Sequence, residues 1–97
     1  MKLTQPTDFE ILEAFEEHGR NVPANIAIHI DKDRPYINTR IPALHDHGLL
    51  SYIGPAEKTG LYELTDRGKA ALNHRDVYNE VGPTDFGELV DECTPIA

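Results

Sequence analysis

The sequence predicts one small α+β domain, and three observations lead to that class. Several stretches repeat apolar residues at helical spacing behind a capping or proline signal, and two short stretches are rich in β-branched, aromatic and aliphatic residues. A segment containing Pro and Gly separates those two stretches. At 97 residues the chain has room for one modest core. We therefore expect helices packed around a single two-stranded hairpin.

The first predicted helix is "TDFEILEAFEEHG". Thr7 and Glu10 are spaced as a capping box, and Gly19 supplies the C-terminal stop. A short second helix, "PANIAIHI", begins at Pro23, which suits a first helical turn. The apolar residues that recur at helical spacing are Ile11, Leu12 and Phe15 in the first helix and Ile26, Ala27 and Ile30 in the second.

A third helix is predicted over residues 33–47. Asp33 suits the N-cap, Pro35 suits the first turn, and Gly48 ends the helix. Pro42 lies inside this pattern, opposite the buried stripe, and removes a hydrogen bond at a cost of roughly 3 kcal/mol. We hypothesise that Pro42 bends the helix. The stripe expected to be buried is Ile37, Ile41 and Leu44.

A β-hairpin and a fourth helix follow. "LLSYIG" and "LYELT" are the predicted strands, and "PAEKTG" is the loop between them. Thr65 then caps the helix "TDRGKAALNH", in which Gly68 suits a close crossing with another element. Since an isolated hairpin is unstable, we expect these strands to pack on the helices.

Beyond His74 the periodic pattern weakens. "PTDF" at 83–86 repeats "PTDF" at 6–9, and coincidence explains so short a match better than duplication. Thr84 is nevertheless a candidate cap for a short helix carrying Phe86, Leu89 and Val90. We therefore divide the chain into a domain over residues 1–75 and an acidic tail over 76–97, a candidate dimerisation or regulatory segment.

The net charge of -8 is unevenly distributed. Residues 1–19 sum to -4, residues 20–75 to +2 and residues 76–97 to -6. An acidic protein as a whole repels nucleic acid, but residues 20–75 carry a positive sum and are not expected to do so. The chain has one cysteine, Cys93, no basic and apolar leader and no membrane-length apolar run, so we expect a cytoplasmic protein without disulfides.

The order helix, short helix, helix, hairpin, helix is that of a winged helix-turn-helix domain. "YINTRIPAL", "HGLL", "GPAEKTGLYELT" and "LTDRG" carry a resemblance to the winged helix-turn-helix regulators of archaea, specifically the haloarchaeal phage-repressor-like group, over about residues 4–72. The resemblance implies transcriptional control through sequence-specific binding to double-stranded DNA, usually as a homodimer, in a cytoplasm at high salt. Four Lys against 17 acidic residues are consistent with such a cytoplasm.

The residues themselves point to the same function. The exposed side of helix 33–47 combines residue types that read base edges or contact phosphates, because Asn pairs with adenine, Arg with guanine, and hydroxyls with either partner. Ordinary solvated positions are the alternative for the charged and polar residues, and half-buried support of the turn is the alternative for Tyr36. The predicted DNA contacts are Arg34, Tyr36, Asn38, Thr39 and Arg40 in the helix, Lys58 in the hairpin loop, and Arg20 and Lys32 before helix N-termini.

Other classes of function find little support. The histidines of "HDH" at 45–47 diverge on a helix, so we expect no metal, and no nucleophile motif or phosphate loop indicates an enzyme or a cofactor. One alternative remains open: a winged helix that binds protein, with an acidic surface that imitates or masks DNA. Placement of Arg34, Arg40 and Lys58 on one face with Asn38 and Thr39 favours DNA binding, whereas Asp31, Asp33 and Glu57 on that face favour the interaction module.

Overall fold

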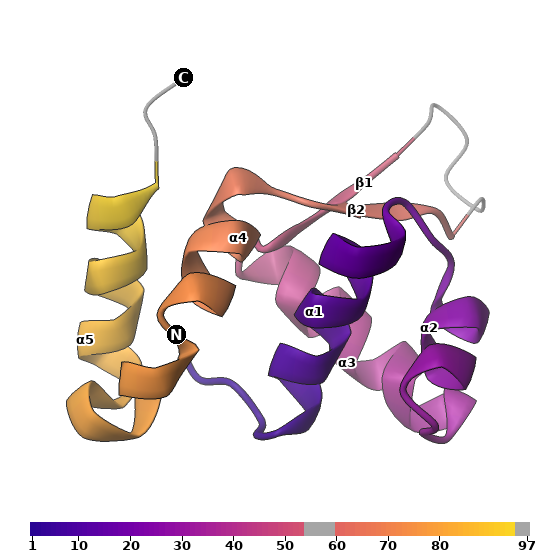
Figure 1. Cartoon of the computed structure of the whole chain (residues 1–97), viewed down its shortest axis with the longest axis horizontal. Coiled ribbons are helices and arrows are strands. Elements are labelled where there is room, and N and C mark those ends of the chain that lie inside the picture. The colour runs from indigo at the N-terminus through magenta and orange to yellow at the C-terminus, as the bar shows by residue number, and fades with distance from the viewer. Residues whose placement is uncertain (54–59, 95–97) are drawn as a thin grey trace.

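The computed structural model describes residues 1–53 and 60–94, which fold as helices around one antiparallel hairpin (Figure 1). This agrees with the α+β class that the sequence predicts. Within the described ranges, no helix combines the length and the apolar character that crossing a bilayer requires. The elements are α1 (Thr7–His18), α2 (Pro23–His29), α3 (Arg34–Asp46), β1 (Leu50–Tyr52), β2 (Tyr62–Leu64), α4 (Asp66–Asn73), a 3-10 turn (Arg75–Val77) and α5 (Tyr78–Cys93).

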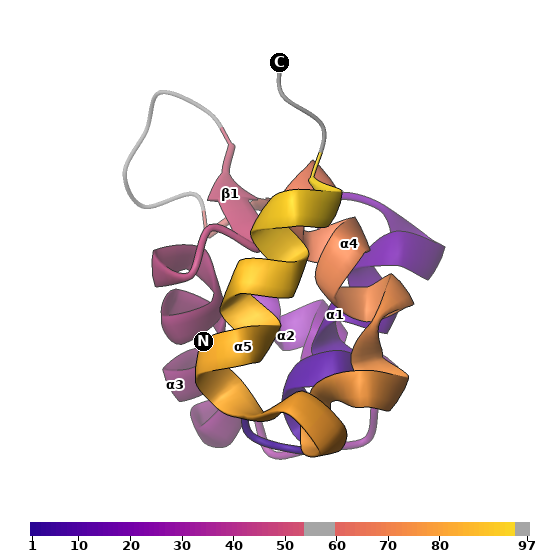
Figure 2. The same cartoon turned by 90° about the vertical axis from the view of Figure 1, so that its left-hand side faces the viewer.

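The hairpin packs on α1, α3 and α4. Helix α1 contacts α2, α3 and β2, while α3 contacts β1. Figure 2 shows α3 along one side of the molecule with β1 above it, and α1 and α4 toward the other side. The strands pair Leu50 with Leu64 and Tyr52 with Tyr62. Asn21, between α1 and α2, exchanges backbone hydrogen bonds of 3.0 and 2.9 Å with Tyr62, so a third chain segment touches the hairpin. The layout is compatible with a winged-helix-like arrangement.

The predicted apolar stripes form the core. In α1 and α3 all six predicted core residues are buried, and in α2 Ile26 and Ala27 are buried while Ile30 is half-buried. Leu49 and Leu50 enter the same cluster from the start of the hairpin. Burial of one stripe from each helix leaves the opposite side of each helix for solvent or a partner.

The prediction that Thr7 and Glu10 form a capping box at the start of α1 is wrong. Pro6 occupies the N-cap position with φ -86° and ψ -3°, and Thr7 is a buried helical residue. The chain turns helically before Thr7, so the Asp8 amide donates to the Thr4 carbonyl at 2.8 Å, and no capping side chain is needed. The Asp8 carboxylate instead accepts a hydrogen bond of 2.7 Å from the Thr4 amide.

The start of α4 is as predicted. The Thr65 hydroxyl accepts a hydrogen bond of 2.9 Å from the Gly68 amide and donates one of 2.6 Å to the Gly48 carbonyl. A Cβ at Gly68 would lie 2.3 Å from the Leu49 carbonyl oxygen. Only glycine therefore allows α4 to approach the segment that follows α3 so closely.

The C-terminal segment lies against the core. Helix α5 is interrupted at Gly82, whose φ of 81° and ψ of 171° are not helical, and the chain resumes a helix after it. Phe86 and Val90 are fully buried. The phenylalanines of the two "PTDF" stretches, Phe9 and Phe86, contact edge to face with ring centroids 6.1 Å apart. The segment 76–94 thus shares the hydrophobic core of the rest of the chain.

Candidate nucleic-acid interface

Helix α3 separates a buried side from an exposed polar side. Asp33 takes the N-cap position with an extended backbone, although no side chain caps the helix, and Pro35 lies in the first turn as predicted. Ile37, Ile41 and Leu44 fix the buried side, so helical geometry places the polar residues between them outward. The predicted site residues that the structure exposes on α3 are Arg34, Tyr36, Asn38 and Thr39.

These four side chains differ in how they are held. Tyr36 is 39% exposed, and the Thr39 hydroxyl donates a hydrogen bond of 2.6 Å to the Tyr36 carbonyl. That bond leaves the acceptor lone pairs of the Thr39 hydroxyl available. Among the described residues, Arg34 and Asn38 have no side-chain partner within the protein. The first turns of α3 therefore present unpaired polar groups to solvent.

Arg40 differs from the other predicted contacts of α3, because its side chain is engaged within the protein. Its Nε and Nη2 donate to the two oxygens of Asp8 at 2.9 and 2.7 Å, and Asp8 is fully buried at the start of α1. The hydrogen bonds to Asp8 raise the pKa of the Arg40 guanidinium, while partial burial opposes that rise. Since two of its nitrogens neutralise a buried carboxylate, we assign Arg40 to holding α3 on α1, and its contact with DNA stays a prediction.

Two further predicted contacts are engaged with carboxylates. Arg20 Nε lies 3.4 Å from an Oε1 of Glu63 on β2, and Lys32 Nζ lies 3.7 Å from Oε1 of Glu10 on α1. All four side chains are partly exposed, so these ion pairs are weak and exchangeable. The last predicted contact, Lys58, lies outside the described residues.

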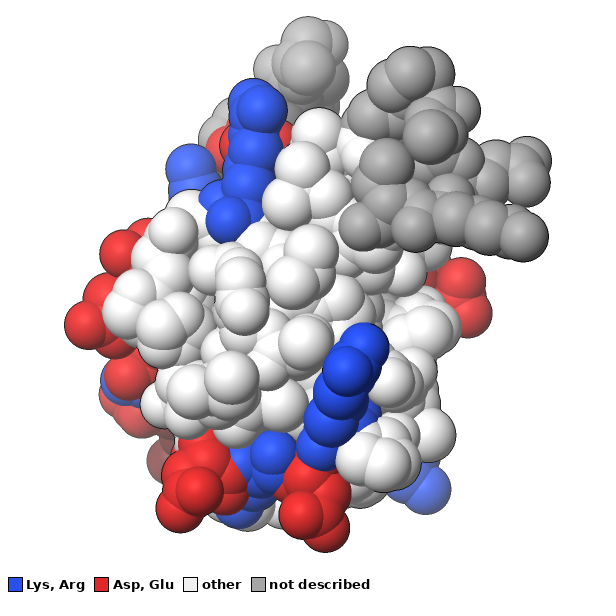
Figure 3. All heavy atoms as spheres, turned by 90° about the vertical axis from the view of Figure 1, so that its right-hand side faces the viewer, with Lys and Arg blue, Asp and Glu red and all other residues white. Residues whose placement is uncertain are grey.

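The end of the molecule that carries α2 has little charge. Figure 3 shows this side as a mostly uncharged surface, on which the Lys and Arg atoms stand apart and acidic atoms gather toward the lower and left edges. Ile28 on α2 is 77% exposed. Asp31 and Asp33 are exposed on either side of Lys32 in the turn before α3. This surface has no concentration of positive charge.

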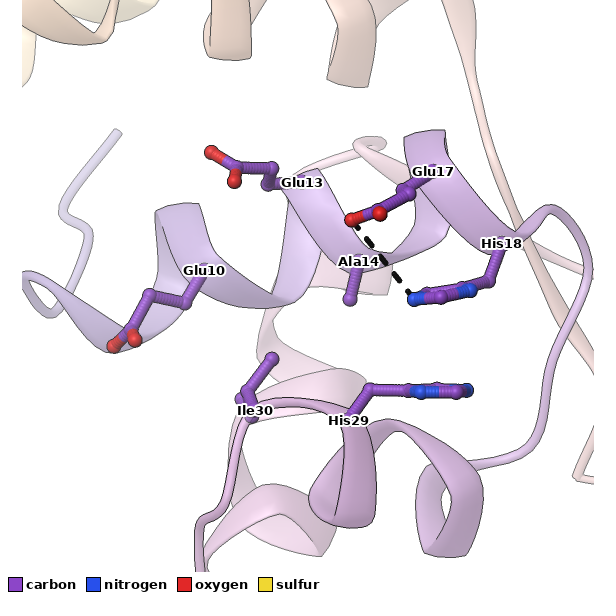
Figure 4. Close-up of a pocket in the computed structure, with 7 residues that line it drawn as sticks. All are labelled: Glu10, Glu13, Ala14, Glu17, His18, His29 and Ile30. Carbon is purple, nitrogen blue, oxygen red and sulfur yellow. Dashed lines mark ion pairs between the residues drawn. The ribbon is translucent and has the colours of Figure 1, made fainter.

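A second feature lies between α1 and α2, where a cavity of about 300 Å³ is bounded by carboxylates and two histidines (Figure 4). The rings of His18 and His29 stack with centroids 3.7 Å apart and planes 9° apart. Stacked rings direct their nitrogens along parallel planes, so they do not converge on one ion. Within the described residues, no group of three or more His, Cys, Asp or Glu is arranged to hold a metal.

The carboxylates of this cavity are largely paired already. Glu10 faces Lys32, Glu13 pairs with Arg75, and Glu17 lies 3.9 Å from the Nε2 of His18. The buried Oε1 of Glu10 accepts no hydrogen bond from the described residues, although the Lys32 ammonium is nearby. We assign no ligand to the cavity, and the exposed side of α3 is the candidate site.

Sequence reasoning missed the two residues that hold this site in place, Asp8 and Arg67. Asp8 is 32 positions from Arg40, and Arg67, at the start of α4, donates to the His47 carbonyl 20 positions away. No local pattern connects such pairs.

Comparison with known proteins adds no family to these observations. No protein family model matches the chain, and no significant similarity to a curated protein or to a solved structure is found.

Proposed function

We propose that this protein is a sequence-specific regulator of transcription that binds double-stranded DNA through a winged helix-turn-helix fold. The observation that carries the proposal is the exposed surface of α3, where Thr39 lies opposite a fully buried stripe and Arg34, Tyr36 and Asn38 lie exposed along its flanks. Further support comes from the element order and from the bridge between Asn21 and Tyr62, which adds a third strand position to the hairpin. In this arrangement α3 enters the major groove and the hairpin lies over the backbone.

The exposed chemistry of α3 suits base reading. The Asn38 amide matches the donor and acceptor of an adenine edge, and the Arg34 guanidinium matches the two acceptors of guanine or a phosphate. Tyr36 and Thr39 offer hydroxyl groups to bases or phosphates. The unpaired amides at the start of α3 favour a phosphate near the helix N-terminus.

The scarcity of free cations defines the mode of binding that we propose. Phosphate contacts lose affinity steeply as salt rises, because releasing counterions into concentrated salt gains little free energy. A protein that works at molar salt benefits little from a broad basic surface. The acidic exterior and the single unpaired arginine exposed on α3 within the described residues, Arg34, therefore fit a regulator that depends on base contacts and DNA shape.

We further propose that the protein acts as a homodimer and as a repressor. One recognition helix reads few base pairs, whereas two helices related by a dyad read a palindrome whose half-sites are about 34 Å apart. Occupation of a promoter by such a dimer blocks transcription without any further domain.

The test is fluorescence-anisotropy titration with a pool of duplex fragments from the native genome, at molar and at low potassium chloride. We expect selective binding that Arg34→Ala and Asn38→Ala each weaken by about tenfold or more, corresponding to a lost base contact. Lys69→Ala on α4 and Asn79→Ala on α5 are the matched controls, because both residues are exposed on other helices. If all four variants bind DNA with the affinity of the wild type, the interface does not include the exposed side of α3.

The second candidate function is a winged-helix module that binds protein. The engagement of Arg40 with Asp8 and the exposure of Asp31, Asp33 and Ile28 favour it. If the wild type binds no duplex at either salt concentration, this candidate replaces the first. The next experiment would then be crosslinking in cells from a photoreactive residue at position 28, with position 79 as the control.

A further inference from the structure

Two side chains at the start of α4 hydrogen-bond to the backbone at the C-terminal end of α3. The Arg67 Nε donates to the His47 carbonyl at 2.8 Å, and the Thr65 hydroxyl donates to the Gly48 carbonyl at 2.6 Å. A Cβ at Gly48 would lie 3.2 Å from the Arg67 Cδ, so the arginine side chain passes closely over this glycine. A cation at this place also faces the negative end of the α3 dipole.

Arg67 simultaneously reaches the C-terminal helix. Its Nη1 forms an ion pair with Asp91 of α5, and the Arg67 side chain is 27% exposed. A cavity of about 490 Å³ lies at this place, and its lining includes Asp46, His47 and Arg67, Glu88 and Asp91 of α5, and Met1 and Lys2 of the N-terminal segment. Arg67 thus bridges a gap between the two helices.

We propose that Arg67 is a positioning residue that couples α5 to the C-terminal end of α3. This inference rests on the proposed function, in which α3 reads DNA. The guanidinium has nitrogens directed at two partners in a fixed plane, so a displacement of Asp91 redirects the nitrogen that holds the His47 carbonyl. The acidic C-terminal helix thereby influences the orientation of the recognition helix, although its negative charge disfavours a place on DNA.

The first arm of the test measures amide hydrogen exchange without DNA. The reporters are the amides of Gly48 and Leu49, which donate to the His45 and Leu44 carbonyls at the end of α3. We expect Asp91→Asn to speed their exchange by about two- to fivefold, as expected for a partly exposed ion pair. We expect Arg67→Met to speed it by roughly tenfold or more, because the His47 carbonyl also loses a charged donor.

Matched controls separate coupling from a general loss of stability. Asp85→Asn removes an exposed α5 carboxylate without a partner in the described residues, and Arg75→Met breaks the exposed pair with Glu13. Neither control is expected to alter exchange at Gly48 or Leu49. The Gly19 amide at the end of α1 serves as the distant reporter and is expected to stay unchanged in every variant. Arg67→Lys keeps the charge but has one nitrogen for two partners, so it restores only part of the protection.

The second arm measures DNA affinity in the same variants. Asp91→Asn is expected to weaken selective binding by two- to fivefold. Asn38→Ala is expected to lower DNA affinity by the same factor whether or not Asp91→Asn is present. If the amides of Gly48 and Leu49 exchange at the same rate in Asp91→Asn and in Asp85→Asn, the coupling is overturned, whatever the DNA result. If exchange responds as expected but the wild type binds no duplex, the coupling holds and the proposed function fails.

Discussion

At the scale of single residues, the pair formed by Asp8 and Arg40 decides how α3 lies on α1. A fully buried carboxylate that loses its cationic partner is left uncompensated, and such losses cost about 3–5 kcal/mol. We expect Arg40→Ala to lower the free energy of unfolding by that amount in urea denaturation. Because apolar replacements of similar volume often substitute for buried pairs, Asp8→Leu with Arg40→Met is expected to recover most of the loss.

The matched control for this prediction is Arg75→Ala. It breaks the pair with Glu13, in which both side chains are about half exposed, and is expected to leave the free energy of unfolding nearly unchanged because water and salt screen such a pair. Equal destabilisation by Arg40→Ala and Arg75→Ala would contradict the role assigned to Asp8.

Tyr62 gives the protein a predictable response to alkaline pH. Burial, and then the neighbouring Tyr52, raise the pKa of the Tyr62 phenol above its ordinary value. Below about pH 10 the phenol is protonated in both the folded and unfolded states, so its contribution to stability is fully present. As pH rises further the unfolded state ionises first, and stability falls until the folded phenol also ionises. Urea denaturation between pH 9 and 11 should show this fall in the wild type and a smaller one in Tyr62→Phe.

Tyr36→Phe, on the exposed side of α3, is the control for the alkaline experiment. It removes a phenol hydroxyl from an exposed side chain, and its free energy of unfolding is measured beside that of Tyr62→Phe at each pH. A dependence that Tyr62→Phe leaves unaltered would show that other groups account for it.

At the same scale, the sequence predicts the exposed residues of the site better than their partners. Periodicity places Thr39 opposite the buried stripe and Arg34 and Asn38 on its flanks, because helical geometry is local. The fate of Arg40 depends on Asp8, which lies 32 positions away on another helix. Only the packing of α1 on α3 brings the two together, so no spacing rule could have separated Arg40 from Arg34.

At the scale of elements, local signals predict most boundaries and fail where the backbone departs from them. Pro23, Asp33 and Thr65 mark helix starts as predicted, and Gly19 marks an end. The capping box at Thr7 fails because the chain is already helical at the preceding proline. The length of α5 was not predictable, because Gly82 and Pro83 interrupt its periodicity and Phe86 is buried by long-range contact with Phe9 and Tyr78.

Pro42 supplies a prediction about one element. It is exposed on α3, and the helix continues through it to Asp46. Pro42→Ala restores the amide that would bond to the Asn38 carbonyl and frees the unfolded chain slightly, so we expect a net gain of about 2 kcal/mol in unfolding free energy. If the proline bends α3 to fit the groove, DNA affinity falls in the same variant.

Pro35→Ala is the control. It lies in the first turn, where no helical hydrogen bond is missing, so it should give no comparable gain in unfolding free energy. A Pro42→Ala variant that is more stable and binds DNA with unchanged affinity would reject the functional bend.

At the scale of the whole molecule, the fold pairs most of the cations predicted to contact DNA with acidic side chains. Of the five cations predicted to contact DNA, Arg34, Arg40, Arg20 and Lys32 lie in the described residues and Lys58 lies outside them. Arg40 neutralises Asp8, while Arg20 and Lys32 face Glu63 and Glu10. Some of the acidic residues therefore serve as partners, within the protein, for its few cations.

This arrangement predicts a shallow dependence of DNA affinity on salt. If each protomer of a dimer neutralises one or two phosphates, through Arg34 and Lys58, the slope of log affinity against log salt is about -2 to -4, compared with about -10 for a regulator with many phosphate contacts. Anisotropy titrations over a potassium chloride series measure it. Arg34→Ala or Lys58→Ala should each make the slope shallower by about 2 per dimer where that residue contacts phosphate, whereas Asn38→Ala should lower affinity at every salt concentration and leave the slope unchanged. A wild-type slope steeper than about -6 would mean that Arg20 and Lys32 exchange their carboxylates for phosphates on binding, and DNA recognition by this acidic protein would then depend on breaking its own ion pairs.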